Sequence, residues 1–173
     1  MKILFTAIGV PGEGAIPTLA SFQEADLRLL RELGHEVRVV VWRGPEVFSI
    51  LRGARWADLV YCWSMSYHSY VASFVAKKLI CAVGGYEFAR IPECNYGNLV
   101  KRRMRLVTYR VWSAADGLLY VNPSLAEEAT RAFGHPGNAH YLPTGYDSTF
   151  WTPGNGPRSD MALTVCHAPT LAR

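Results

Sequence analysis

The densest group of chemically versatile side chains follows an expected strand at Leu79–Val83. Gly84 and Gly85 come directly after the strand, and they allow a ligand to approach the backbone closely. The next residues offer hydrogen-bond donors, hydrogen-bond acceptors and ring faces: Tyr86, Glu87, Arg90, Asn95 and Tyr96. This set suits a hydroxyl-rich ligand, and the Glu87 carboxylate could orient a hydroxyl or accept its proton. A long loop with solvated side chains is the alternative, but loops beyond about 12 residues are uncommon unless they are functional.

A glycine-rich loop after an expected strand at Lys2–Ile8 is the second candidate site. Three of its residues lie before an expected helix: Gly12, Glu13 and Gly14. Backbone N–H groups at a helix start favour a bound anion, whereas the alternative is a plain tight turn. The spacing of the glycines differs from that of a dinucleotide fingerprint. The next strand also ends at Arg43, whereas the fingerprint has a carboxylate there. A dinucleotide site is therefore disfavoured, and the absence of a following Gly-Lys pair excludes a P-loop.

Histidine and cysteine residues offer little further chemistry. His68 stands between an expected strand at Asp58–Trp63 and an expected helix, where it could contact a ligand; a solvent-exposed histidine at the helix start is the alternative. The cysteines show neither a CxxC pair nor a metal-binding spacing with histidine: Cys62, Cys81, Cys94 and Cys166. Buried or idle thiols in a reducing compartment are the simpler interpretation. We expect no metal site, and no Ser/His/Asp arrangement can be argued.

A basic helix surface lies further along the chain, on an expected helix at Leu99–Ala115. Five cationic residues lie off its apolar stripe, with no acidic residue among them: Lys101, Arg102, Arg103, Arg105 and Arg110. A solvated helix face is one interpretation. An anionic partner is the other, either acidic lipid headgroups at a membrane surface or a phosphorylated substrate. Nucleic acid is not expected, because no helix-turn-helix, zinc-finger or RNA-binding pattern accompanies the charge.

Strands that alternate with helices must position these residues. Strands are expected at Lys2–Ile8, Val37–Trp42, Asp58–Trp63, Leu79–Val83, Gly117–Val121 and Ala139–Leu142. Helices are expected before Gly34 and at Ser69–Lys78, Leu99–Ala115 and Ser124–Phe133. This alternation predicts an α/β fold with a doubly wound, Rossmann-like parallel sheet and helices on both faces. In such a sheet ligands bind beyond the carboxyl ends of the strands, where the candidate loops lie.

The first expected helix carries start and stop signals. It begins between Pro17 and Ser21, and Ser21–Glu24 fits a capping box. Its apolar residues fall on one stripe at helical spacing: Leu19, Phe22, Ala25, Leu29, Leu30 and Leu33. Gly34 then ends the helix.

Composition excludes several classes of protein. The chain has 173 residues, of which 50% are hydrophobic and 18% charged, so it is too apolar for a disordered protein. No stretch approaches the roughly 18–20 apolar residues that span a bilayer. The apolar run at the N-terminus is too short for a signal peptide. The formal charge of +4 is only a mild basic excess. We expect a cytoplasmic protein, with peripheral attachment to a membrane left open.

The C-terminal part differs from the rest. Residues 143–160 contain three prolines and three glycines but few aliphatic residues, which indicates a linker. Met161–Cys166 is expected to form one more buried strand, and a lone strand cannot make a domain. The predicted organisation is therefore a Rossmann-like domain at residues 1–150, followed at residues 151–173 by a linker and an orphan strand of a missing second domain.

Four segments together resemble the N-terminal half of family 4 retaining glycosyltransferases, which have the two-domain GT-B fold. These are Pro11–Gly14, Glu32–Val37, Gly84–Glu87 with Tyr96–Gly97 downstream, and Leu142–Pro153. The last is similar to the family's PNGVD…F.P passage between its domains. The resemblance covers nearly the whole chain. It implies transfer of a sugar from a nucleotide-sugar to an acceptor hydroxyl with retained anomeric configuration, and no cofactor or obligatory metal.

The resemblance also implies roles for particular residues. Gly12, Glu13 and Gly14 would approach the donor diphosphate, and Tyr86 and Glu87 would lie on the acceptor side with Arg90, Asn95, Tyr96 and His68. Glu87, Thr144 and Tyr146 stand where many relatives carry Asp, Asn and Val, and the histidine of their catalytic region is absent after the fourth strand. Glu87 is thus only a weak candidate for the general base.

The family's basic diphosphate clamp and paired glutamates belong to a C-terminal domain that this sequence lacks. The resemblance therefore implies weak nucleotide-sugar binding and no turnover by these 173 residues alone. Two other interpretations are a non-catalytic α/β binding module that forms a homodimer through its unpaired cleft, and a nucleotide-binding oxidoreductase, which the glycine order disfavours.

Overall fold

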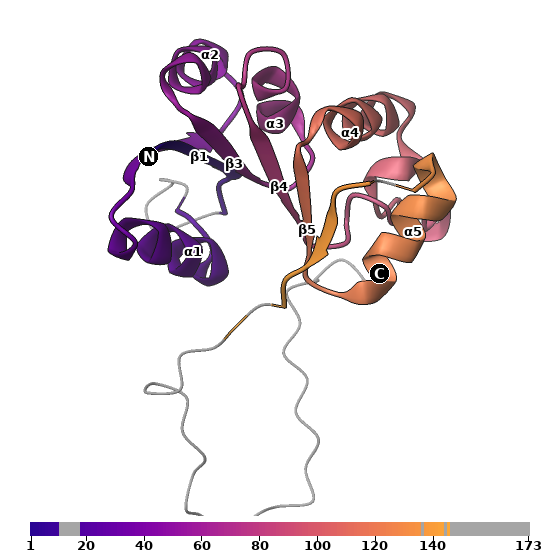
Figure 1. Ribbon diagram of the computed structural model, residues 1–173. Coiled ribbons are helices and arrows are strands. Elements are labelled where there is room, and N and C mark those ends of the chain that lie inside the picture. The colour runs from indigo at the N-terminus through magenta and orange to yellow at the C-terminus, as the bar shows by residue number, and fades with distance from the viewer. Residues whose placement is uncertain (11–17, 136, 144, 146–173) are drawn as a thin grey trace, which may run out of the picture. The chain divides into compact units, whose positions relative to one another are not determined.

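The computed structural model describes residues 1–10, 18–135, 137–143 and 145 (Figure 1). The chain divides into two compact units, residues 1–143 and 144–173, and every element named below belongs to the first. The glycine loop residues Gly12, Glu13 and Gly14 lie outside the described residues, as does the expected strand Met161–Cys166. The predicted domain boundary at residue 150 lies there too and stays a prediction.

Six described strands form one sheet in which every neighbouring pair is parallel. They are β1 (Lys2–Ile8), β2 (Glu36–Trp42), β3 (Leu59–Trp63), β4 (Leu79–Val83), β5 (Gly117–Tyr120) and β6 (Ala139–Tyr141). Their order in the sheet is β2-β1-β3-β4-β5-β6. Each strand lies within a residue or two of its expected position, and the predicted α/β fold with a parallel sheet is confirmed.

The helices are α1 (Ser21–Glu32), α2 (Val47–Trp56), α3 (Tyr67–Ala72), α4 (Arg102–Ala114) and α5 (Pro123–Phe133), with short 3-10 helices η2 (Pro92–Cys94) and η3 (Asn98–Val100). α2 has no counterpart among the expected helices. It packs closely because Gly53 lies against Leu4 of β1, where an added Cβ would come within 2.8 Å of a Leu4 methyl carbon. α3 is shorter than expected, and α4 begins later because its expected first turn belongs to η3.

Right-handed crossovers decide which face each helix covers. β2 lies on one side of β1, whereas every later strand is added on the other side, so α1 lies on the opposite face from the helices that follow (Figure 1). The larger core accordingly joins Ile50 of α2, Val111 of α4 and Leu125 of α5 with residues of the sheet. The smaller core lies under α1, where Leu27 packs with Phe5.

Partly buried hydrogen bonds anchor α1 to the sheet. Asp26 Oδ2 accepts from the Tyr61 hydroxyl at 2.7 Å and from the Trp63 indole nitrogen at 2.9 Å. The expected apolar stripe is wrong in part, because Leu29 and Leu33 are 54% and 62% exposed. The helix is rotated so that Asp26 and Leu27, rather than Leu29 and Leu33, face the sheet.

The expected capping box is also wrong in its first residue. The N-cap is Ala20, one residue before Ser21. Gln23 Oε1 accepts a hydrogen bond from the Ala20 N–H at 2.9 Å, which is one half of a capping box. Alanine has no side-chain oxygen for the other half.

Candidate functional site

The long loop after β4 is ordered by backbone contacts within itself. Ile91 and Tyr96 pair in both directions, with N···O distances of 3.0 and 3.1 Å. Gly97 has φ 100°, and a Cβ at this position would overlap the Ala89 carbonyl. Only glycine fits there without strain, since φ in this region is rarely adopted by other residues. The loop therefore has a defined backbone conformation at the carboxyl edge of the sheet.

Tyr86 and Tyr96 form an exposed aromatic pair on this loop. Their ring centroids lie 4.9 Å apart at an interplanar angle of 86°, and the residues are 40% and 45% exposed. Edge-to-face packing holds each ring while leaving part of its surface open. The structure thus brings together two of the residues expected on the acceptor side.

Glu87 points into the protein rather than toward the ligand side. It is only 2% exposed, and its Oε2 accepts a hydrogen bond from the Gly85 N–H at 2.9 Å. Burial raises the pKa of the nearby Tyr120 to about 12, and the Glu87 carboxylate has a smaller effect in the same direction. In this position the carboxylate fixes the glycine turn, and its role as a proton acceptor stays a prediction.

Asn98 is a key residue of this loop that sequence reasoning missed. Its side-chain nitrogen donates to the Met65 carbonyl at 2.9 Å and to the Thr108 hydroxyl at 3.0 Å, and its backbone N–H donates to the Tyr86 carbonyl at 3.0 Å. One buried amide therefore joins the loops after β3 and β4 to α4. Nothing in the local sequence separates it from Asn95, which is exposed and takes a left-handed conformation at the end of η2.

The expectation of a solvent-exposed His68 is wrong. His68 is fully buried, and neither ring nitrogen has a hydrogen-bond partner at good geometry within the described residues. Burial lowers the pKa of the imidazole to about 3, against a smaller opposing effect of the Trp63 backbone. The ring is therefore neutral and lies beneath the surface, so it offers no direct contact to a ligand in this conformation. It follows Ser64, whose φ of 75° turns the chain sharply after β3.

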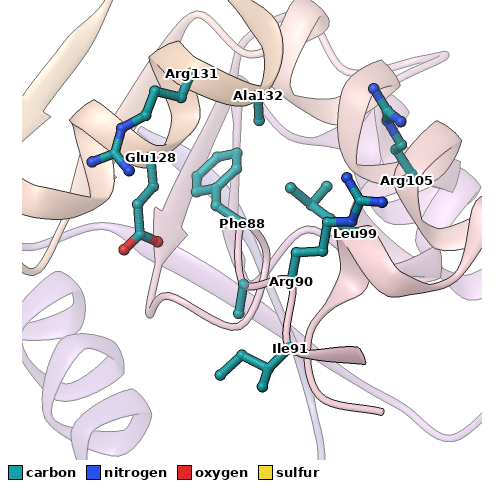
Figure 2. A pocket seen from close by; sticks show the side chains of 9 residues that line it. Phe88, Arg90, Ile91, Leu99, Arg105, Glu128, Arg131 and Ala132 are labelled. Atoms are coloured by element: carbon teal, nitrogen blue, oxygen red, sulfur yellow. The ribbon is translucent and has the colours of Figure 1, made fainter. Parts of the chain in front are cut away.

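Arg90 lines a pocket of about 450 Å³ between the loop after β4, α4 and α5, and neither Tyr86 nor Tyr96 lines this pocket. The pocket is lined by Phe88, Ala89, Arg90, Ile91, Leu99, Arg105, Glu128, Arg131 and Ala132. Figure 2 shows Glu128 and Arg131 on the α5 side and Arg90, Leu99 and Arg105 on the other side. The expected acceptor residues are thus divided between two surfaces and the interior.

The basic helix surface is also divided by the structure. Arg110 is not part of a solvated face: its guanidinium lies 4.9 Å from the Phe74 ring centroid and donates to the Ser73 carbonyl at 3.0 Å. It joins α4 to the end of α3. Lys101, Arg102, Arg103 and Arg105 are all exposed, and Arg102 and Arg105 also line pockets beside α5.

The base of the glycine loop after β1 is closed by a backbone pair. Val10 and Thr18 donate to each other's carbonyls at 2.9 and 3.0 Å. β1 lies between β2 and β3, where the chain reverses its direction of travel across the sheet. Such a reversal is where open α/β sheets form a ligand crevice, so the loop begins at the expected place.

Three cysteines lie within the described residues. Cys62 and Cys81 are buried opposite each other on β3 and β4, and burial raises the pKa of both thiols. Cys94 is exposed in η2. In this part of the chain no group of His, Cys, Asp or Glu side chains is arranged to hold a metal ion. Among the described helices, none has the length and apolar character to cross a membrane.

No protein-family model matches the sequence. No curated protein matches it either. Similar solved structures include crystal structures of Alr3699/HepE from Anabaena. The complex with UDP has a TM-score of 0.59 and 18% identity, and the complex with UDP-glucose has 0.60 and 17%. A third, with UDP and glucose, has 0.59 and 17%.

In each case the match covers 90% of this chain and 47% of the other. The chain therefore spans about half the length of these proteins. At this identity the similarity shows the fold, an α/β domain with a parallel sheet.

Proposed function

We propose that this chain is the acceptor-binding half of a glycosyltransferase that moves a sugar from a nucleotide-sugar to an acceptor hydroxyl with retention. The observation that carries the proposal is the fold match to half of a protein crystallised with UDP-glucose. The four sequence segments that resemble the N-terminal half of retaining glycosyltransferases support it independently. These 173 residues correspond to half of such a protein, so we expect no turnover from them alone.

The acceptor surface in this proposal is the aromatic pair on the loop after β4. Tyr86 and Tyr96 each leave part of a ring open to solvent. An apolar ring face with a hydroxyl at its edge suits a sugar, which has C–H groups on its faces and hydroxyls around its rim. Glu87 and Asn98 contribute by fixing the loop from beneath, through the hydrogen bonds to Gly85, Met65 and Thr108.

The donor side in this proposal is the glycine loop after β1. Gly12, Glu13 and Gly14 precede α1 in the sequence and would present backbone N–H groups to the diphosphate, and no metal ion is needed for this contact. A second domain would supply cationic side chains to the same diphosphate. Without that domain we expect weak donor binding and no turnover.

Ligand-observed NMR with the purified chain tests the proposal. We expect weak, saturable binding of UDP-glucose and of at least one member of a panel of mono- and oligosaccharides. Tyr86→Ala and Tyr96→Ala should weaken saccharide binding several-fold and leave UDP-glucose binding unchanged. Phe48→Ala is the control, because Phe48 is 84% exposed on α2, away from the loop.

The outcomes separate the proposal from its alternatives. Saccharide binding without UDP-glucose binding would indicate a non-catalytic binding module. Binding of NADP in place of UDP-glucose would indicate an oxidoreductase. Binding of neither class of ligand would overturn the proposed function. Robust sugar transfer by the chain alone would overturn the expected inactivity.

A further inference from the structure

The pocket between α4, α5 and the loop after β4 collects cationic side chains from three separate elements. Arg90 comes from the loop, Arg105 from α4 and Arg131 from α5, against a single carboxylate at Glu128 (Figure 2). Residues this far apart in sequence meet only because the β5–α5–β6 crossover lays α5 beside α4. The sequence pattern indicates the α4 cations but gives no sign that Arg90 and Arg131 are their neighbours.

Two of the three arginines have no salt-bridge partner within the described part of the chain. Among the described residues, Arg90 and Arg105 make no salt bridge, whereas Arg131 pairs with Glu127 at 3.7 Å on the exposed side of α5. The single carboxylate of Glu128 does not balance the three guanidinium groups of the pocket, so they repel each other. A bound anion removes that repulsion, and guanidinium groups bind phosphate oxygens in a two-pronged geometry that lysine cannot match.

The surroundings of the arginines are apolar. Phe88, Ile91 and Leu99 line the same pocket. A second pocket of about 510 Å³ shares Arg105 and Ala132 with the first and adds Arg102, Leu106, Tyr109 and Phe133. Leu106 and Tyr109 are 63% and 50% exposed, which leaves an apolar surface directly beside the cationic one. This pairing suits a ligand with both a phosphate and an apolar chain.

We propose that the pocket at Arg90 and Arg105 binds the phosphate group of an amphiphilic phosphate ester, whose apolar part lies along Leu106 and Tyr109. Arg131 contributes less because Glu127 already neutralises part of its charge. Arg110 is excluded, since its guanidinium is held by Phe74 and Ser73. The site is independent of sugar transfer, so it stands or fails separately from the proposed function.

Glu128 gives the site a distinctive signature. Its carboxylate lies in the pocket and opposes an anion. Glu128→Gln keeps the size of the side chain but removes the charge, so phosphate should bind several-fold more tightly. A pocket that recognises hydroxyls through Glu128 would respond in the opposite direction.

Calorimetric titration with hexyl phosphate and with inorganic phosphate tests the site. We expect saturable binding of both, with hexyl phosphate bound more tightly. These arginines are solvent-exposed, which weakens their charged hydrogen bonds, so Arg90→Gln and Arg105→Gln should each weaken binding by about tenfold or less. Leu106→Ser should remove the advantage of the hexyl chain.

Arg103→Gln is the matched control, because Arg103 is an exposed arginine on α4 that does not line the pocket. It should change the dissociation constant less than twofold. Equal losses in Arg103→Gln and Arg105→Gln would overturn the site in favour of unspecific charge attraction. Absence of any saturable binding by the wild-type chain would overturn it as well.

Sedimentation with vesicles identifies the source of the phosphate. One set contains phosphatidylcholine alone and the other also contains phosphatidic acid. Binding to the acidic vesicles that Arg105→Gln abolishes and Arg103→Gln retains would assign the pocket to a membrane headgroup. Saturable binding of hexyl phosphate without vesicle binding would assign the pocket to a free phosphorylated ligand. Either result supports the site.

Discussion

Replacing Gly97 by alanine should destabilise the loop after β4 more than any other glycine substitution in the described part of the chain. Gly97 has φ 100° and ψ 153°, a conformation that is almost confined to glycine. An added Cβ would also overlap the carbonyl of Ala89, which is backbone and cannot move aside without shifting the loop. Two separate costs therefore act at one position.

The size of each cost follows from the structure. A residue held in this region of φ and ψ costs about 1–3 kcal/mol. Forcing an extra methyl group into a packed site costs about 1–3 kcal/mol more. We therefore expect Gly97→Ala to lower the free energy of unfolding by about 3–5 kcal/mol, a large share of the roughly 5–15 kcal/mol of a typical domain.

Two control substitutions separate the costs. Gly34 has φ 78° but open space around it, so Gly34→Ala should lose only the conformational cost of about 1–2 kcal/mol. Gly84 has open space and no positive φ, so Gly84→Ala should be close to neutral. Urea denaturation followed by circular dichroism gives the three values. A loss for Gly97→Ala no greater than that for Gly34→Ala would refute the overlap with Ala89.

Three further predictions concern buried polar groups. The pKa of His68 is lowered from 6.5 to about 3, so the unfolded chain binds a proton that the folded chain excludes. The free energy of unfolding should therefore fall as pH drops below about 6.5, by about 1.4 kcal/mol per pH unit. Urea denaturation of His68→Gln should show a shallower pH slope than that of the wild type. Asp26→Ala leaves the Tyr61 hydroxyl and the Trp63 indole N–H without their acceptor, so it should lower the free energy of unfolding in urea by about 2–3 kcal/mol. The exposed control Glu24→Ala should change it by no more than about 0.5 kcal/mol. Equal effects would contradict the anchoring role of Asp26. Glu87→Gln keeps an oxygen that can accept the hydrogen bond from the Gly85 N–H, so it should retain saccharide binding in the NMR assay. Glu87→Ala removes this acceptor and should weaken the binding. A loss in both variants would instead favour a role for the charge.

The sheet was predictable because buried parallel strands are short, continuous apolar runs. Lys2–Ile8 and Leu79–Val83 have the expected bounds in the structure. α2 was missed because Gly53 stands in the middle of the segment and glycine disfavours a helix, although the buried residues Ile50, Gly53 and Ala54 share one helix face. Its contact with β1 depends on the absence of a side chain, which hydrophobic patterning does not register.

The candidate site was predictable as a location but not as an arrangement. The rule that ligands bind at the carboxyl ends of parallel strands pointed to the loop after β4. The direction of each side chain depends on the positive φ of Gly85 and Gly97, which turns Glu87 inward and leaves Tyr86 exposed. The contacts of Asn98 with Met65 span 33 residues, and no local pattern contains such a partner.

Cys94 gives this loop a chemical handle of its own. Burial suppresses ionisation of Cys62 and Cys81, so thiol reagents should modify Cys94 first among the described cysteines. The residue lies in η2, within the hairpin that Ile91 and Tyr96 close. With Cys166 replaced by serine, a maleimide fluorophore at this position would report directly on how the loop responds to sugars and phosphates, without any engineered labelling site.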